Sequence, residues 1–185
     1  MGQRYLDLTA KWRVQKPRFI DKMPSNWRVI GSIRAMLPGA HIVVCRRDPL
    51  ENCWSCFKQF FPSGWEFTYD FDQLAAFWKA FHRAASEWSH RSPQYVREQE
   101  YEALIENPEL EIRALLEFCG LPFDASCLRF HDSNRSVRTL SASQVRQPMQ
   151  KAASRTAGYG ALLDPLRTAL GLPPIGAPGQ SRPTA

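Results

Sequence analysis

The sequence lacks the features that mark membrane, exported and disulfide-rich proteins. No apolar run among its 185 residues approaches the roughly 18 needed to cross a bilayer. An export signal needs an unbroken apolar stretch, but the amino-terminal segment carries four charged residues, Arg4, Asp7, Lys11 and Arg13. Five cysteines cannot all pair within one chain, and their spacing shows no disulfide framework. We therefore expect a cytoplasmic protein without a membrane anchor.

One cysteine pair has the spacing of a redox or zinc motif. Cys53 and Cys56 are separated by two residues, as in such motifs, but no second pair follows at ligand spacing. Cys53 also falls in an apolar stripe of the helix expected there. We expect neither a metal nor a redox centre.

Acidic residues are outnumbered by basic ones. Lys and Arg total 24 against 18 Asp and Glu, a formal net charge of +6. This balance favours anionic ligands such as nucleotides, phosphate esters, nucleic acids or acidic peptides, although a solvated basic surface gives the same sum. The basic residues are dispersed and form no recognition helix, so we do not expect nucleic-acid binding.

Short candidate strands alternate with helical patterns along the chain, which is typical of a parallel α/β sheet. Three runs are predicted as strands: Arg18 to Asp21, Ala40 to Arg46 and Tyr95 to Gln99. The second is nearly continuous in apolar residues, as in a strand covered by helices on both faces. We predict one domain over residues 1–171, followed by a Pro/Gly/Ser-rich tail over 172–185 that we expect to be disordered.

Capping signals and apolar periodicity place the helices between these strands. Ser25 is expected to cap a helix that ends before Pro38, and Asp48 to cap one that begins at Pro49, with Glu51 at capping-box spacing. Two further helices are predicted, from Asp70 to about Ser89 and from Asn107 to Gly120.

The strongest functional signal is an arginine pair at the end of the second predicted strand. In open α/β sheets ligands bind at the carboxyl ends of the strands, where Arg46 and Arg47 are delivered. A guanidinium can hold a phosphate through two parallel hydrogen bonds, and Ser55 on the following helix can add a third donor. The alternative is that Arg47 forms a structural ion pair with Asp48 or Glu51, and that Ser55 is merely exposed.

Six short runs occur in a characteristic order. They are Asp21 to Pro24, Leu37 to Pro49, Cys53 to Cys56, Glu100 to Leu104, Phe118 to Leu121 and Arg138 to Pro148. In this order they resemble the sulfotransferase family, most closely the bacterial members often fused to tetratricopeptide repeats and related to tyrosylprotein sulfotransferases. The resemblance covers roughly residues 4 to 170, and each run alone is weak evidence.

This resemblance implies a partial three-layer α/β fold like that of P-loop nucleotidases, with 3′-phosphoadenylyl sulfate as donor and no metal. Arg47 and Ser55 would bind the 3′-phosphate of the donor, and Tyr101 would lie near the adenine. Ser141 would open a loop over the 3′ side of the nucleotide, and Lys22 would stabilise charge on the leaving phosphate. A core tyrosine and a solvated lysine are the alternatives for Tyr101 and Lys22.

Two features depart from the family pattern. Gln59 stands where tyrosylprotein members carry an arginine, and no Gly-x-x-x-x-Gly-Lys-Ser/Thr loop occurs anywhere in the sequence. The family's catalytic base has no counterpart here, and no histidine is predicted to replace it. We therefore expect the carboxyl-terminal part of a sulfotransferase domain, without the strand, phosphate loop and helix that hold the sulfuryl end. The alternative is an adenosine 3′,5′-bisphosphate-binding module without catalysis. The sequence predicts neither the acceptor nor the oligomeric state.

Overall fold

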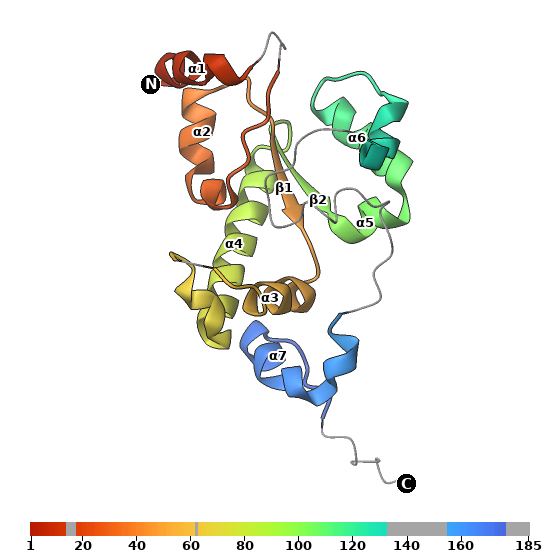
Figure 1. The fold of residues 1–185 in the computed structure, drawn as a ribbon. Coiled ribbons are helices and arrows are strands. Elements are labelled where there is room, and N and C mark those ends of the chain that lie inside the picture. The colour runs from red at the N-terminus through yellow and green to blue at the C-terminus, as the bar shows by residue number, and fades with distance from the viewer. Residues whose placement is uncertain (14–17, 62, 133–154, 177–185) are drawn as a thin grey trace.

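The structure is a computed structural model that describes residues 1–13, 18–61, 63–132 and 155–176. It is mostly helical, with a short sheet near its centre (Figure 1). The elements, in chain order, are α1 (Gly2–Thr9), η1 (Ala10–Trp12), η2 (Pro24–Val29), α2 (Ile30–Met36), β1 (Ile42–Arg46), α3 (Pro49–Phe57), η3 (Glu66–Tyr69), α4 (Phe71–Arg91), β2 (Val96–Glu100), α5 (Tyr101–Glu106), α6 (Pro108–Phe118), η4 (Ala125–Asp132), η5 (Ala157–Leu163) and α7 (Asp164–Leu170).

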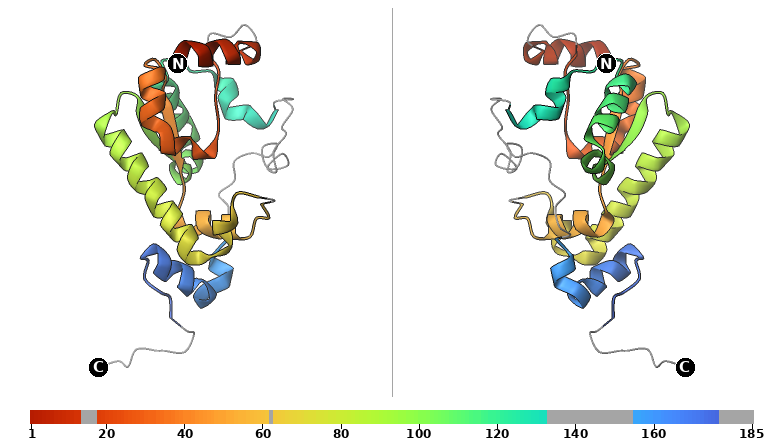
Figure 2. Two further views of the ribbon diagram at one scale, coloured as in Figure 1. Left: turned by 90° about the vertical axis from the view of Figure 1, so that its left-hand side faces the viewer. Right: turned by 90° about the vertical axis from the view of Figure 1, so that its right-hand side faces the viewer.

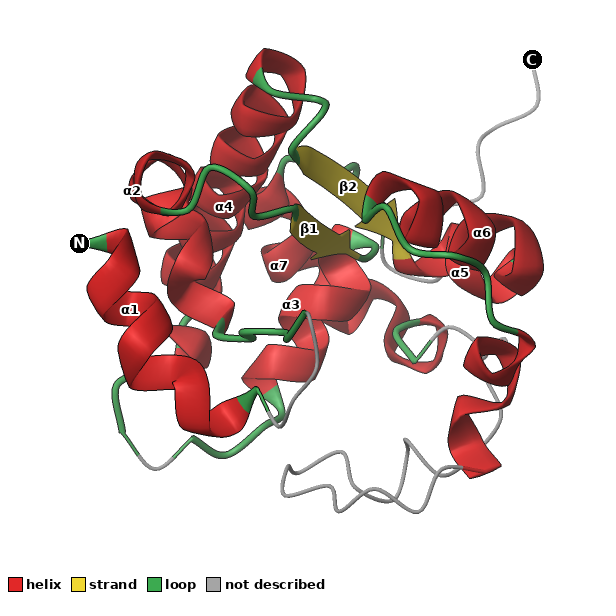
Figure 3. Cartoon of the chain, turned by 90° about the horizontal axis from the view of Figure 1, so that it is seen from above, coloured by secondary structure: helices red, strands yellow, loops and turns green. Residues whose placement is uncertain are grey.

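The two strands run parallel and lie between layers of helices. Ile42 pairs with Val96 and Arg46 with Glu100, so both strands end at the same edge of the sheet. Helices α2 and α4 cover one face, and α5 and α6 lie on the other side (Figure 3). This arrangement confirms the partial three-layer α/β fold and two of the three predicted strands.

The third predicted strand, Arg18 to Asp21, is wrong. These residues form no ladder with β1 or β2 in the described part of the chain. Arg18 instead donates a hydrogen bond to the carbonyl of Cys119 at the end of α6, and Phe19 stacks on Tyr5 of α1 with ring centroids 6.3 Å apart. A short segment becomes a strand only where another strand can pair with its backbone, and here the contacts are made by side chains.

The starts of α3 and α4 are set by acidic caps. The Asp48 carboxylate accepts a hydrogen bond from the Glu51 N–H at 2.8 Å, and Asp70 accepts one from the Gln73 N–H at 2.9 Å, which confirms both predicted starts. The expected Ser25 cap is wrong. The cap of η2 is Met23, two residues earlier, and the helix begins at Pro24, whose fixed backbone angle suits a first helical position.

Two apolar clusters share the long helix α4. One cluster joins α3, α4 and α7 at the carboxyl ends of the strands, and its buried members are Leu50, Cys53, Leu74, Ala75, Leu163, Leu166 and Leu170. The other joins α2, both strands and α4, with Ile30, Val44, Ala85 and Val96 buried. Figure 2 shows α1 and α7 at opposite ends of the molecule, with α4 running between them.

The chain folds back after α7. The backbone N–H groups of Ile175 and Gly176 donate to the Asp164 carboxylate at 2.8 and 3.2 Å. The rest of the predicted tail, residues 177–185, lies outside the described residues. Among the helices of the described segments, none has the length and apolar character needed to cross a membrane.

Candidate functional site

The arginine pair at the end of β1 is divided between the two sides of the sheet. Successive residues of a strand point to opposite faces, so Arg46 and Arg47 cannot serve the same contacts. Arg46 reaches the helix α4, whereas Arg47 contacts residues of α3 and α5. The two guanidinium groups therefore have different roles.

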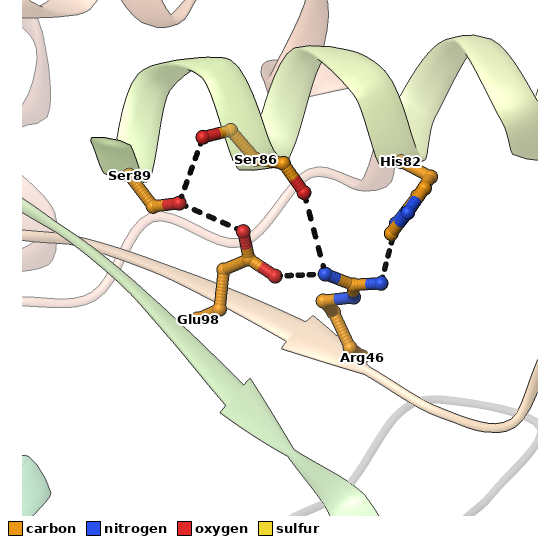
Figure 4. A network of polar contacts seen from close by, with 5 residues as sticks. All are labelled: Arg46, His82, Ser86, Ser89 and Glu98. Atoms are coloured by element: carbon orange, nitrogen blue, oxygen red, sulfur yellow. Dashed lines mark hydrogen bonds and ion pairs between the residues drawn. The ribbon is translucent and has the colours of Figure 1, made fainter. Parts of the chain in front are cut away.

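Arg46 belongs to a polar network that ties β1 to β2 and α4 (Figure 4). Its guanidinium pairs with the Glu98 carboxylate and donates to Nδ1 of His82, and it lies 3.5 Å from the Ser86 hydroxyl. Ser89 donates to the second oxygen of Glu98 at 2.7 Å. Each polar side chain in this half-buried network thus has a partner, which is the condition for burying it at low cost.

The ionisation of this network favours its present hydrogen bonds. Burial raises the pKa of Glu98, but hydrogen bonds from Arg46 and Ser89 and the charge of Arg46 outweigh burial and lower it overall. Burial and the charge of Arg46 lower the pKa of His82, against a smaller opposing effect of Glu98. A lowered pKa favours the neutral imidazole, whose unprotonated Nδ1 can accept a hydrogen bond from Arg46.

Arg47 lies between α3 and the start of α5. Its Nη2 is 3.3 Å from the Glu51 carboxylate, and its guanidinium carbon lies 5.1 Å from the centroid of the Tyr101 ring. The ion pair with Glu51 is the alternative that the sequence leaves open, and it is present. Tyr101 is 38% exposed and directly follows β2, so it is not a core tyrosine. An arginine and an aromatic face thus meet at the carboxyl edge of the sheet.

Two residues that sequence reasoning misses complete this cluster. Thr156, which precedes η5, donates to Glu51 from its backbone N–H at 2.9 Å and from its hydroxyl at 2.8 Å. Glu102 accepts a hydrogen bond from the Asp48 N–H at 3.0 Å. No local pattern could reveal Thr156, which lies 105 residues beyond Glu51 in the chain. Glu102 adjoins Tyr101, so the strand-end argument could have included it.

The other predicted site residues are not joined to this cluster. Ser55 is half-buried on α3, two turns beyond Asp48, and Lys22 is exposed just before η2. In the part of the chain that the structure describes, neither side chain has a hydrogen bond or ion pair with Arg47 or Tyr101. Ser141 lies outside the described residues.

The two closely spaced cysteines have the properties of packing residues. Cys53 is 1% exposed, and burial, with smaller contributions from Cys56 and Asp48, raises the pKa of its thiol to about 12. Burial raises the pKa of Cys56 as well. A protonated, buried thiol is a poor metal ligand and a poor nucleophile. The described residues include no group of three His, Cys, Asp or Glu side chains that could hold a metal ion.

Comparison with known proteins identifies the family. Residues 1–125 match the model of the sulfotransferase family. The chain belongs to the sulfotransferase family. An uncharacterised Aquifex aeolicus (strain VF5) protein is 34% identical over 155 residues, 82% of this chain and 20% of its own length. A Caenorhabditis elegans protein named "Putative protein-tyrosine sulfotransferase" is 26% identical over 152 residues, 80% of this chain and 59% of its own length. This sulfotransferase chain therefore spans less than two thirds of either relative.

Proposed function

We propose that this sulfotransferase chain uses 3′-phosphoadenylyl sulfate as donor and binds it, and its product adenosine 3′,5′-bisphosphate, at the carboxyl edge of the sheet. The observation that carries the proposal is the pairing of Arg47 with Tyr101 directly after the two parallel strands, with the guanidinium 5.1 Å from the ring centroid. A cation beside an exposed aromatic face suits a ligand that carries both a phosphate and a base. The edge of the sheet is also where such ligands bind in open α/β folds.

The residues at this edge fit such a nucleotide. Arg47 makes one long ionic contact with Glu51, and its buried Nε has no hydrogen-bond partner in the described part of the chain. A guanidinium with spare donors can hold a phosphate through two parallel hydrogen bonds. The exposed ring of Tyr101 can stack on the adenine, an interaction that any base provides through its π face. Ser55 and Ser141 are proposed as further donors to the 3′-phosphate.

The donor supplies the sulfuryl group, which passes to an acceptor hydroxyl or amine. Residues of this chain would hold the nucleotide in place, and positioning is a large part of catalysis in such transfers. Lys22 is proposed to stabilise the charge that develops on the leaving phosphate, because a fixed cation acts most strongly where charge grows. The alternative is a module that binds adenosine 3′,5′-bisphosphate without catalysis.

The binding proposal makes a direct prediction. The chain should bind adenosine 3′,5′-bisphosphate more tightly than adenosine 5′-monophosphate, by about tenfold or more, because only the first carries the phosphate that Arg47 would hold. Isothermal titration calorimetry of the 185-residue chain with both ligands tests this. If a sample shown to be folded by circular dichroism binds the two ligands with equal affinity, the proposed 3′-phosphate site is wrong.

The assignment of Lys22 is tested by turnover. Where donor-dependent sulfation is observed, with a tyrosine peptide as the first acceptor to try, Lys22→Ala is expected to lower kcat while donor affinity changes little. Lys11, which is also exposed, provides a matched control as Lys11→Ala. If Lys22→Ala alters only the Michaelis constant for the donor, Lys22 is a binding residue and its catalytic assignment fails.

A further inference from the structure

We infer that Glu51 competes with the 3′-phosphate of the nucleotide for the same hydrogen-bond donors. The Glu51 carboxylate accepts hydrogen bonds from Arg47 and Thr156 when no nucleotide is bound, and the 3′-phosphate displaces it. The inference rests on the proposed function and deepens it by assigning roles to Glu51 and Thr156. It starts from three donors that converge on one side chain. Arg47 Nη2 lies 3.3 Å from Oε2 of Glu51, and Thr156 donates to Oε1 from its N–H and its hydroxyl at 2.9 and 2.8 Å.

The groups that converge on Glu51 are those that bind phosphate in proteins. A guanidinium, a backbone N–H and a hydroxyl are all common phosphate donors, and a carboxylate is an acceptor-only anion like a phosphate. They come from two separate parts of the chain, Arg47 at the end of β1 and Thr156 just before η5, and meet the Glu51 carboxylate on α3. Thr156 is buried and the side chain of Glu51 is 12% exposed, so the cluster is not a loose surface ion pair.

Glu51 is not required to complete the cap of its own helix. At its position, three residues after Asp48, a capping box would send its carboxylate back to the Asp48 N–H. That N–H instead donates to Glu102 of α5 at 3.0 Å, while Asp48 itself caps the helix by accepting from the Glu51 N–H. Turning the Glu51 side chain away would therefore leave both hydrogen bonds at the helix start intact.

The contact between Arg47 and Glu51 also leaves room for a better acceptor. It involves a single nitrogen at a distance just beyond normal hydrogen-bond length, and the buried Nε of Arg47 has no partner among the described residues. A phosphate could take two parallel hydrogen bonds from the same guanidinium. If Glu51 kept its place, its negative charge would lie beside the phosphate and repel it, so it must weaken binding.

The decisive experiment changes the charge of Glu51 and keeps its shape. Glu51→Gln retains an oxygen that can accept from Thr156, so the fold should be preserved, and it removes the competing charge. We expect adenosine 3′,5′-bisphosphate to bind roughly three- to tenfold more tightly to this variant, with adenosine 5′-monophosphate affinity nearly unchanged. Glu102→Gln is the matched control, because it removes a carboxylate that contacts the same helix start but neither Arg47 nor Thr156, and it should give a smaller gain.

A second variant tests the donors independently. Thr156→Val removes the hydroxyl that donates to Glu51 in the free protein and would donate to the phosphate in the complex. This variant should bind the bisphosphate about two- to tenfold more weakly. If the unmodified chain prefers the bisphosphate but Glu51→Gln binds it no more tightly than the unmodified chain does, the inference is wrong and the proposed function still holds. Failure of the folded, unmodified chain to prefer the bisphosphate overturns both. An equal gain in Glu51→Gln and Glu102→Gln also overturns it, because the effect would then be general electrostatics.

Discussion

Arg47→Ala is expected to weaken adenosine 3′,5′-bisphosphate binding by about 1.5–3 kcal/mol, roughly tenfold to more than a hundredfold. The loss is large because charge-assisted hydrogen bonds to a phosphate are stronger than neutral ones, and Arg47 is the cation that the structure places against Tyr101. Affinity for adenosine 5′-monophosphate should change little. Calorimetry with both ligands measures the difference, and Arg47→Lys should recover only part of it because an ammonium lacks the planar fork.

Arg46→Ala provides the comparison for this prediction. Arg46 faces Glu98 and His82 rather than Arg47's neighbours, so its loss should affect nucleotide binding less and stability more. Removing it leaves the half-buried Glu98 carboxylate without its ionic partner. Binding must therefore be compared on samples shown to be folded. If the folded Arg46→Ala protein loses more affinity than Arg47→Ala, the two strand-end residues have been assigned to the wrong sides of the sheet.

Leu166→Ala is expected to lower the free energy of unfolding by about 2–5 kcal/mol. Leu166 has no exposed surface and lies in the cluster that attaches α7 to α3 and α4, so truncation leaves a cavity there. Leu162→Ala is a matched control, since Leu162 is 77% exposed four residues earlier and should change stability by no more than about 0.5 kcal/mol. Urea denaturation of both variants gives the two values. Similar losses in the two proteins would contradict the packing described for α7.

The parts of the fold that the sequence predicts are those with a strong local pattern. Strand β1 and helix α4 follow from a continuous apolar run and from a regular apolar spacing, and Asp48 is a recognisable cap. The wrong strand, residues 18–21, has a suitable composition but no strand beside it among the described residues. Strand formation depends on a neighbour, and no local window contains that information.

The sequence likewise predicts only the part of the candidate site that has a local pattern. Arg47 and Tyr101 each follow a strand directly, so the rule that parallel strands end at one edge brings them together. The i,i+4 spacing of Arg47 and Glu51 also makes their ion pair predictable as an alternative. The contact of Thr156 with Glu51 depends on how η5 and α7 return to α3, which is a tertiary feature without a local signature.

Helix α4 gives the molecule a mechanical property that its separate contacts do not suggest. Its 21 residues make a rod about 30 Å long. One part of the rod is held by the cluster that contains Leu166, and another part holds Arg46 through His82 and Ser86. A change in how α7 packs against α4 is therefore expected to shift the end of β1, where Arg46 is followed directly by Arg47. The packing of α7 and the position of Arg47 thus both depend on α4, although the two lie far apart in the chain.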